Sequence, residues 1–225
     1  MSGFEKWIFD SFPTFGGQLH FSGTQVGEDP FNGYQEGLGT WITVKDSSGW
    51  AYPEISKNKT GNSVLNPPEN KSFTIEAQVF LPNQPNDRQV ILQKLSPDLK
   101  QGFTLHVEPS STSTVVGSFS IISGNVSNFV EATLEKGKFN HLCVSLNRES
   151  GNNFLQFFVN GDLEKESKKE KNISVLNDNS NLYIGSGSSF YLEGALATPL
   201  QTFSGTLDEL RIFHSYRSEE HTSEL

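Results

Sequence analysis

The chain has 225 residues, of which 34% are hydrophobic and 18 are Phe, and its formal net charge is −9. This acidic balance argues against nucleic acid and anionic membrane surfaces as partners, because both favour a basic face. No apolar run approaches the roughly 20 residues that span a bilayer, and a single cysteine, Cys143, excludes an intrachain disulfide. A chain of this length can bury a substantial core, in which Cys143 is expected to be a small, buried residue.

Residues 1–16 are predicted to form an N-terminal arm, because Trp7, Ile8 and Phe12 lie near helical spacing. We favour an arm that packs on its own domain; the alternative is an arm that docks on a neighbouring chain in a homo-oligomer or a particle. The segment has neither the apolar stretch nor the cleavage site of a signal peptide. An extracellular role is therefore expected to need another export route, release by lysis or a missing upstream part.

Residues 217–225, with the sequence RSEEHTSEL, resemble the in-frame translation of a common sequencing-library adapter. We therefore expect a non-native tail here, with the natural chain continuing beyond Tyr216. His221 lies in this tail and is assigned to no site.

Residues 18–134 read as a series of strands. Gln18–Gly23 alternates and ends in Gly, whereas residues 24–68 are divided by Gly and Pro turns and are interpreted as an insertion with a candidate strand at 40–44. Ser72–Leu81 is the clearest strand, with apolar residues at every second position. Further strands are predicted at 90–94, 103–107, 117–122 and 129–134. Turn-rich links at intervals of about 10 to 14 residues are typical of a β-sandwich.

Residues 139–166 predict a three-strand meander. Apolar residues alternate with polar ones in both 142–146 and 155–159, which puts one apolar row on one face. Asn160-Gly161 closes the second run and predicts a type I′ hairpin turn, in which both central residues have positive φ. The mixed charges of Glu164–Lys171 predict a solvated edge strand that blocks edge-to-edge pairing.

Several of these segments resemble laminin G-like domains of the concanavalin A-like lectin/glucanase superfamily. Phe139–Leu146 followed by Leu155–Gly161 is similar to the central signature of the family, and Leu182–Gly185 and Phe203–Phe213 (FSGTLDELRIF) are similar to its later strands. The resemblance implies an all-β, concanavalin A-like fold, a jelly-roll β-sandwich of two antiparallel sheets. We expect one such domain over residues 17–216.

Catalysis is not expected. The glucanases of this superfamily need two carboxylates that flank the glycosidic bond, and their Glu-x-Asp-x-x-Glu pattern is absent. Asp208 and Glu209 are adjacent, so on a regular strand they would point to opposite faces. There is no Gly-x-Ser-x-Gly motif and no zinc-ligand spacing.

No cofactor is required by this interpretation, but the resemblance makes calcium a candidate. Many members of the family hold calcium at the rim of the sandwich through Asp, Asn and carbonyl oxygens, since this hard cation prefers oxygen. Asp87, Asp178 and Asn179 are the candidate ligands, although Asp and Asn in loops are usually turn formers.

Sugar binding needs an exposed aromatic platform beside polar groups. Trp50 and Tyr52 in the insertion, or Phe190 and Tyr191 in the Gly/Ser-rich segment 185–194, are the candidates. The alternative is that these aromatic residues cap the core.

The sequence therefore predicts a non-catalytic binding or adhesion module for a glycan or a protein surface, with carbohydrate as the favoured ligand. A structural component of a virus particle, such as a phage tail or fibre protein, is the first alternative, and a glucanase-like hydrolase is the second. The expected location is extracellular or on a virion surface, with a cytoplasmic location left open.

Overall fold

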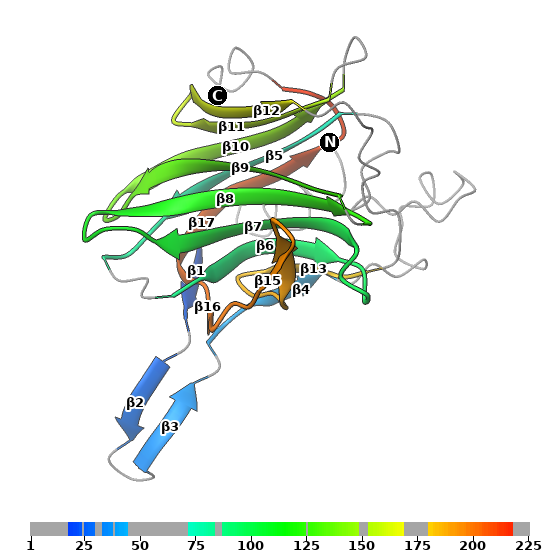
Figure 1. Ribbon diagram of the computed structural model, residues 1–225. Helices are drawn as coiled ribbons and strands as arrows, with labels where there is room; N and C mark the ends of the chain where they lie inside the picture. The colour runs from blue at the N-terminus through cyan, green and yellow to red at the C-terminus, as the bar shows by residue number, and fades with distance from the viewer. Residues whose placement is uncertain are drawn as a thin grey trace, which may run out of the picture.

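The computed structural model describes residues 18–23, 25–29, 33–37, 39–44, 72–83, 87–124, 126–148, 153–168 and 180–217. All regular secondary structure in these ranges is β-strand. They contain no helix long and apolar enough to cross a membrane. Two large sheets pack face to face (Figure 1), which confirms the predicted all-β sandwich.

The first sheet has six antiparallel strands and brings together distant parts of the chain. Its opening strand pairs with the closing strand, and its far side is the predicted meander. In spatial order the strands are β1 (Leu19–Ser22), β17 (Ser204–Phe213), β5 (Phe73–Phe80), β10 (Phe139–Asn147), β11 (Phe154–Val159) and β12 (Asp162–Lys168).

The second sheet has seven strands, six of them antiparallel and one short parallel strand at β6. The order is β4 (Ile42–Val44), β13 (Leu182–Ile184), β6 (Gln89–Leu95), β7 (Gln101–Pro109), β8 (Thr114–Ser123) and β9 (Val126–Glu135), with β16 (Gln201–Thr202) also paired to β6. Because β4 lies in the segment interpreted as an insertion, part of that segment belongs to the sandwich.

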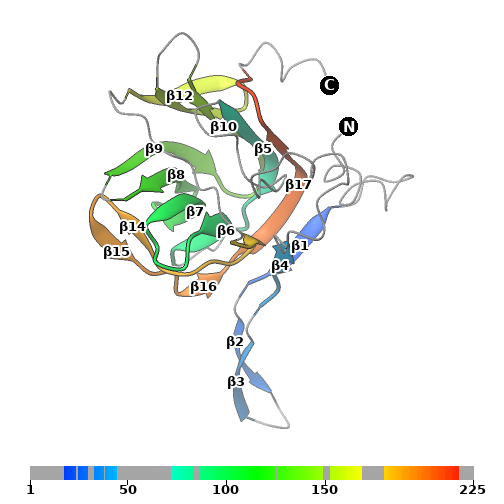
Figure 2. The same cartoon turned by 90° about the vertical axis from the view of Figure 1, so that its right-hand side faces the viewer.

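Two small hairpins complete the described structure. The ribbon of β2 (Gln25–Asp29) and β3 (Gly33–Gly37) extends away from the sandwich in both views (Figures 1 and 2). The hairpin of β14 (Phe190–Leu192) and β15 (Ala195–Ala197) lies on the outer side of the seven-stranded sheet, opposite the six-stranded sheet (Figure 2).

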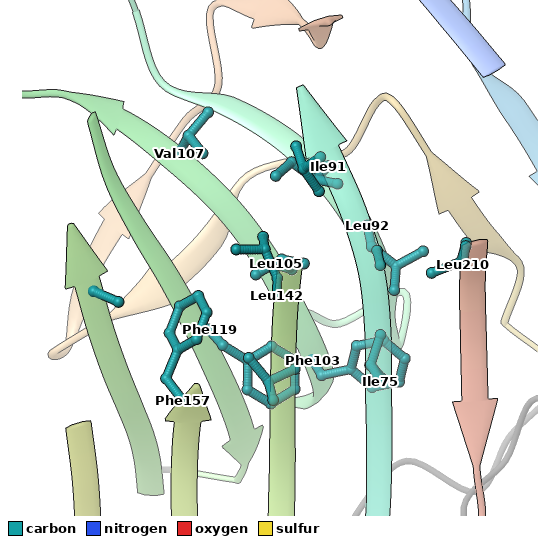
Figure 3. Close-up of a cluster of buried hydrophobic side chains, with 14 of the residues drawn as sticks. Ile75, Ile91, Leu92, Phe103, Leu105, Val107, Phe119, Leu142, Phe157 and Leu210 are labelled. Carbon is teal, nitrogen blue, oxygen red and sulfur yellow. The ribbon is translucent and has the colours of Figure 1, made fainter. Parts of the chain in front are cut away.

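One continuous core fills the space between the sheets. Ile75, Leu142 and Phe157 from the six-stranded sheet face residues of β6, β7 and β8 (Figure 3). Phe73 of β5 lies with its ring centroid 6.0 Å from that of Phe103 and 6.4 Å from that of Phe119. The period of two in the sequence therefore points the expected residues inward.

The meander confirms the turn and edge predictions. Val159 pairs with Asp162, so Asn160 and Gly161 form a two-residue turn, and their φ angles of 53° and 95° are those that a type I′ turn requires. Strand β12 is the last strand of its sheet and is mostly exposed. Cys143 is buried, as expected.

Part of the outer face of the six-stranded sheet is buried, although simple alternation predicts exposed side chains there. Thr74 and Glu76 point away from the core, yet both are buried. The Thr74 hydroxyl donates to the Ser215 carbonyl at 2.9 Å and accepts from the Arg217 backbone N–H at 3.1 Å. Arg217 Nε is also 3.4 Å from Glu76 Oε1. Residues 214–217 thus cover part of this face.

Strand β17 is not regular where regularity was expected. The pairing with β5 shifts register between Asp208 and Arg211, and Glu209 has a φ of 51°. Leu207 and Leu210 are both buried in the core, so neither acid between them points inward. The expectation that Asp208 and Glu209 lie on opposite faces is wrong because a bulge interrupts the alternation.

Some expectations fall outside the described residues. These are the N-terminal arm at 1–16 and the tail beyond Arg217. The boundary between domain and tail remains a prediction. The assembly role proposed for the arm, and with it the virus-particle alternative, stays a prediction too.

Candidate functional site

The β14–β15 hairpin covers part of the outer face of the seven-stranded sheet. Phe190 is opposite Ala197 in the hairpin, and both side chains are buried on the sheet side. They form a small apolar cluster, separate from the main core, with Val90 of β6 and Ile122 of β8. This cluster holds the hairpin on the sheet.

The opposite side of the hairpin faces the solvent. Tyr191 and Leu196 are cross-strand neighbours with exposed fractions of 41% and 56%. The turn between the strands is Glu193-Gly194, whose φ angles of 50° and 83° are both positive, as in a type I′ turn. The hairpin therefore presents an aromatic ring and an aliphatic side chain side by side on a short, tightly turned ribbon.

His106 of β7 connects the hairpin to a half-exposed charge pair. The ring of His106 lies 4.8 Å from the ring of Phe190, centroid to centroid. Its Nε2 is 3.3 Å from Glu108 Oε1, and the Nε of Arg88 donates to the same oxygen at 2.7 Å. These contacts run from the hairpin to the end of the sheet.

The electrostatics of this group follow from the hydrogen bonds to Glu108. The bond from His106, and then that from Arg88, lower the pKa of Glu108 to about 2, although partial burial acts in the other direction. A carboxylate only accepts hydrogen bonds, so Nε2 of His106 carries a proton. In the neutral ring, Nδ1 is then an acceptor.

Three buried polar atoms lie on the same outer face without a hydrogen-bond partner among the described residues. They are His106 Nδ1, Ser118 Oγ and Ser120 Oγ. His106 is directly opposite Ser118 in the β7–β8 pairing, and Ser120 is two residues further along β8. We call these three residues the inner polar row.

The base of the hairpin is attached to the sheet by Gln93 of β6. Its Oε1 accepts the backbone N–H of Ser188 at 2.7 Å, and its Nε2 donates to the Ser188 carbonyl at 3.1 Å. Nε2 also lies 3.2 Å from the Thr104 hydroxyl. Hydrogen bonds thus hold the chain just before the hairpin on the sheet, whereas the strands of the hairpin are held by the small apolar cluster.

The candidate binding residues differ in their exposure to solvent. Phe190 is fully buried against His106, so the prediction that its ring offers an exposed platform is corrected: strand alternation turns it toward the sheet. The same alternation turns Tyr191 outward. Trp50 and Tyr52 lie outside the described residues.

Sequence reasoning missed Arg88, Glu108 and the inner polar row. A partial signal was present, because His106 lies on the predicted strand 103–107 and Glu108 follows it directly, and residues two apart on a strand share a face. Nothing local shows, however, that Phe190, 84 positions later, would lie on that face.

The described residues do not test the calcium prediction, which stays a prediction. They contain no group of three or more His, Cys, Asp or Glu side chains that could hold a metal ion. Asp87 is half-buried just before β6, and Asp178 and Asn179 lie outside the described residues. The carbonyl of Ser180, which follows them, accepts a hydrogen bond from the buried Lys94 ammonium.

The comparison with protein families agrees with this architecture. A laminin G family model, described as the concanavalin A-like lectin/glucanases superfamily, matches residues 54–222. The chain belongs to this superfamily. The match confirms the resemblance drawn from the central and closing strands. A search among curated proteins finds no match.

Solved structures share the superfamily fold at low sequence identity. A native heptameric SAP-like pentraxin from Limulus polyphemus is 14% identical, with a TM-score of 0.53 and coverage of 71% of each chain. The CBM40 of the Ruminococcus gnavus IT-sialidase, bound to α2,3-sialyllactose, is 12% identical, with a TM-score of 0.53 and coverage of 91% of this chain and 93% of that one.

A third similar structure comes from a study of botulinum neurotoxin type C and its interaction with two ganglioside molecules. It is 11% identical, with a TM-score of 0.53, and the match covers 92% of this chain but 43% of the toxin chain. At these identities the likeness shows the fold alone.

Proposed function

We propose that this member of the superfamily is a non-catalytic module that binds carbohydrate at surfaces outside the cell. Its exposed binding surface, which we call the hairpin platform, consists of Tyr191 and Leu196 on the hairpin and the Arg88–Glu108 pair at the end of the sheet. The observation that carries the proposal is the exposed ring of Tyr191. On the buried side of the same hairpin, Phe190 contacts His106, which in turn hydrogen-bonds to Glu108 of the charge pair.

The chemistry of the platform suits a sugar. An exposed aromatic ring offers a flat apolar face to the C–H groups of a sugar ring, and nearby polar groups select its hydroxyls or a carboxylate. Arg88 has five N–H donors, of which Nε is used by Glu108. The similar CBM40 is bound to α2,3-sialyllactose, and the similar botulinum neurotoxin interacts with two ganglioside molecules, which supports the same ligand class.

Catalysis has little support in the geometry. Ser118 and His106 are cross-strand neighbours, but Ser118 Oγ makes no hydrogen bond within the described residues, so His106 does not activate Ser118 as a nucleophile. Glu209 lies on a bulge, with its carboxylate 3.8 Å from Arg211. We therefore expect no release of reducing sugar from soluble polysaccharides.

A glycan array followed by titration tests the proposal. We expect the native protein to bind carbohydrate on the array, and Tyr191→Ala to weaken that binding by about tenfold, the size of effect expected for a central aromatic contact. Lactose and α2,3-sialyllactose are suitable soluble probes for calorimetry, because they share a neutral core and differ by one carboxylate-bearing sugar.

The matched control is Leu163→Ala. Leu163 is also an exposed apolar residue, but it lies on β12 at the edge of the other sheet. This variant should bind like the native protein. A native protein that binds no glycan, or a Tyr191→Ala variant with native affinity, would reject the platform as a carbohydrate site.

A further inference from the structure

The inner polar row contains three buried polar atoms that lack partners in the described chain. Buried polar side chains in folded proteins nearly always have a hydrogen-bond partner, so three exceptions beside one another need an explanation. His106, Ser118 and Ser120 are each fully buried. They come from adjacent strands and project from the same face of the sheet.

What covers this face is chemically mismatched to it. The ring of Phe190 packs at a tilt against that of His106, and the hairpin meets the sheet through the cluster of Val90, Ile122, Phe190 and Ala197. A phenyl ring and methyl groups cannot satisfy two hydroxyls and an imidazole nitrogen. When the hairpin covers them, these polar atoms are shielded from water and gain no hydrogen bond from the described part of the chain.

We propose that the β14–β15 hairpin is a displaceable cover, and that the inner polar row beneath it binds the hydroxyl groups of an uncharged sugar ring. This rests on the proposed carbohydrate-binding function and adds a second surface to it, under the hairpin. A ligand hydroxyl can donate to His106 Nδ1 and exchange hydrogen bonds with Ser118 and Ser120, so it satisfies the atoms that the closed hairpin leaves unsatisfied.

The spacing and charge of the row define the ligand class. Directly opposed residues in antiparallel strands are about 5 Å apart at Cβ, which is close to the width of one six-membered sugar ring. The two serines carry no charge, and an imidazole with its single proton on Nε2 accepts a hydrogen bond at Nδ1. Such a row suits neutral hydroxyls, whereas a ligand carboxylate would be directed to Arg88 outside the hairpin.

The hairpin can move without disturbing the sandwich. Its strands have three residues each, and a two-stranded ribbon has little stability of its own. The small cluster under it is separate from the main core. Displacing it breaks the contact of Phe190 with His106 and leaves the interior between the two sheets intact.

Chemical modification of His106 tests the movement. Diethyl pyrocarbonate reacts with imidazole nitrogen, and mass spectrometry of peptides reports each histidine separately. We expect His106 to react at a rate well above that of global unfolding, and Phe190→Ala to raise the rate about tenfold or more because the ring no longer holds the hairpin down. The exposed His20 serves as the internal standard, and its rate should not change.

The double substitution Ser118→Ala with Ser120→Ala tests the ligand. Removing two buried hydroxyls that lack partners should leave the melting temperature unchanged or raise it. The same change should weaken lactose binding about tenfold or more, since each lost hydrogen bond is expected to cost several-fold in affinity. A purely structural role for the serines predicts no loss of binding, so the two readouts move in opposite directions only if the row binds the ligand.

The outcomes separate this inference from the proposed function. Modification of His106 only at the rate of global unfolding, or native lactose affinity in the double-serine variant, would overturn the displaceable cover and its inner row while the hairpin platform stands. If the native protein binds no carbohydrate at all, the proposed function fails and the inner row fails as a sugar site with it. Faster modification of His106 in Phe190→Ala, together with loss of lactose binding in the double-serine variant, would support the inference.

Discussion

The ring of Phe190 lies 4.8 Å from the ring of His106, with the two planes at 55°. This contact joins a hairpin near the end of the chain to the middle of the seven-stranded sheet. The next residue along, Tyr191, faces the opposite way and is exposed. Two adjacent aromatic residues thus have different roles, one in holding the hairpin and one in presenting a surface.

The first prediction separates these roles by stability. Phe190→Ala should lower the free energy of unfolding by about 2–4 kcal/mol, because it removes a fully buried ring from a small cluster. Tyr191→Ala should change the free energy of unfolding by no more than about 0.5 kcal/mol, since the Tyr191 side chain is exposed to solvent. Urea denaturation of both variants provides the comparison. Equal losses would show that Tyr191 packs as tightly as Phe190.

The second prediction concerns acid stability and Glu108. Its pKa falls from 4.5 to about 2 on folding, so the ionised carboxylate stabilises the protein above about pH 4.5, and that contribution is lost as the pH falls toward 2. Glu108→Gln should therefore lower the melting temperature at pH 7 and flatten its dependence on pH between 4.5 and 2.

Glu135→Gln is the control for this experiment. Glu135 is 2.8 Å from Lys138, but both side chains are exposed, and exposed ion pairs contribute little to stability. This variant should follow the native curve over the whole range. If Glu108→Gln also follows it, the hydrogen bonds from His106 and Arg88 do not stabilise the folded protein.

The third prediction has the opposite sign and concerns Glu76. Burial raises the pKa of Glu76 above 4.5, even though Arg217 and Arg211 act to lower it. Its contribution to stability is therefore present below pH 4.5 and is lost as the pH rises through the raised pKa. Glu76→Gln should be more stable than the native protein at pH 7 and equal to it at pH 4. A less stable variant at pH 7 would show that the contact with Arg217 outweighs the cost of burial.

The fourth prediction tests calcium, which the family resemblance made a candidate. If Asp178 and Asn179 bind calcium, millimolar calcium should raise the melting temperature, and EDTA should reverse the change. Asp178→Asn should remove the effect, whereas Asp87→Asn would remove it only if Asp87 is a ligand. An unchanged melting temperature on addition of calcium would contradict calcium binding.

Much of the sandwich could be predicted because strand periodicity is local information. Alternation in Phe73–Leu81 and in 142–146 sets which side chains share a face, and any two-layer fold must then bury that face. The turn at Asn160-Gly161 was equally readable, since few residues accept two successive positive φ angles. The edge position of β12 followed from its charges.

The burial of individual polar side chains, on which the candidate site also depends, could not be predicted in the same way. Lys94 continues the alternation of β6 and faces the core opposite Phe103, and its ammonium reaches the carbonyl of Ser180. Thr74 is covered by Ser215, 141 positions away. In each case a distant segment decides whether a polar side chain meets water or protein.

Local sequence was enough to predict the layers, the Asn160-Gly161 turn and the resemblance to the family, because alternation, turn residues and short motifs each involve residues close together in the chain. The surface that we propose for ligand binding depends instead on the hairpin of Phe190 and Tyr191 folding back over His106 and Ser118. That contact joins residues more than 70 positions apart, and long-range packing, to which no local pattern is sensitive, determines where such segments meet.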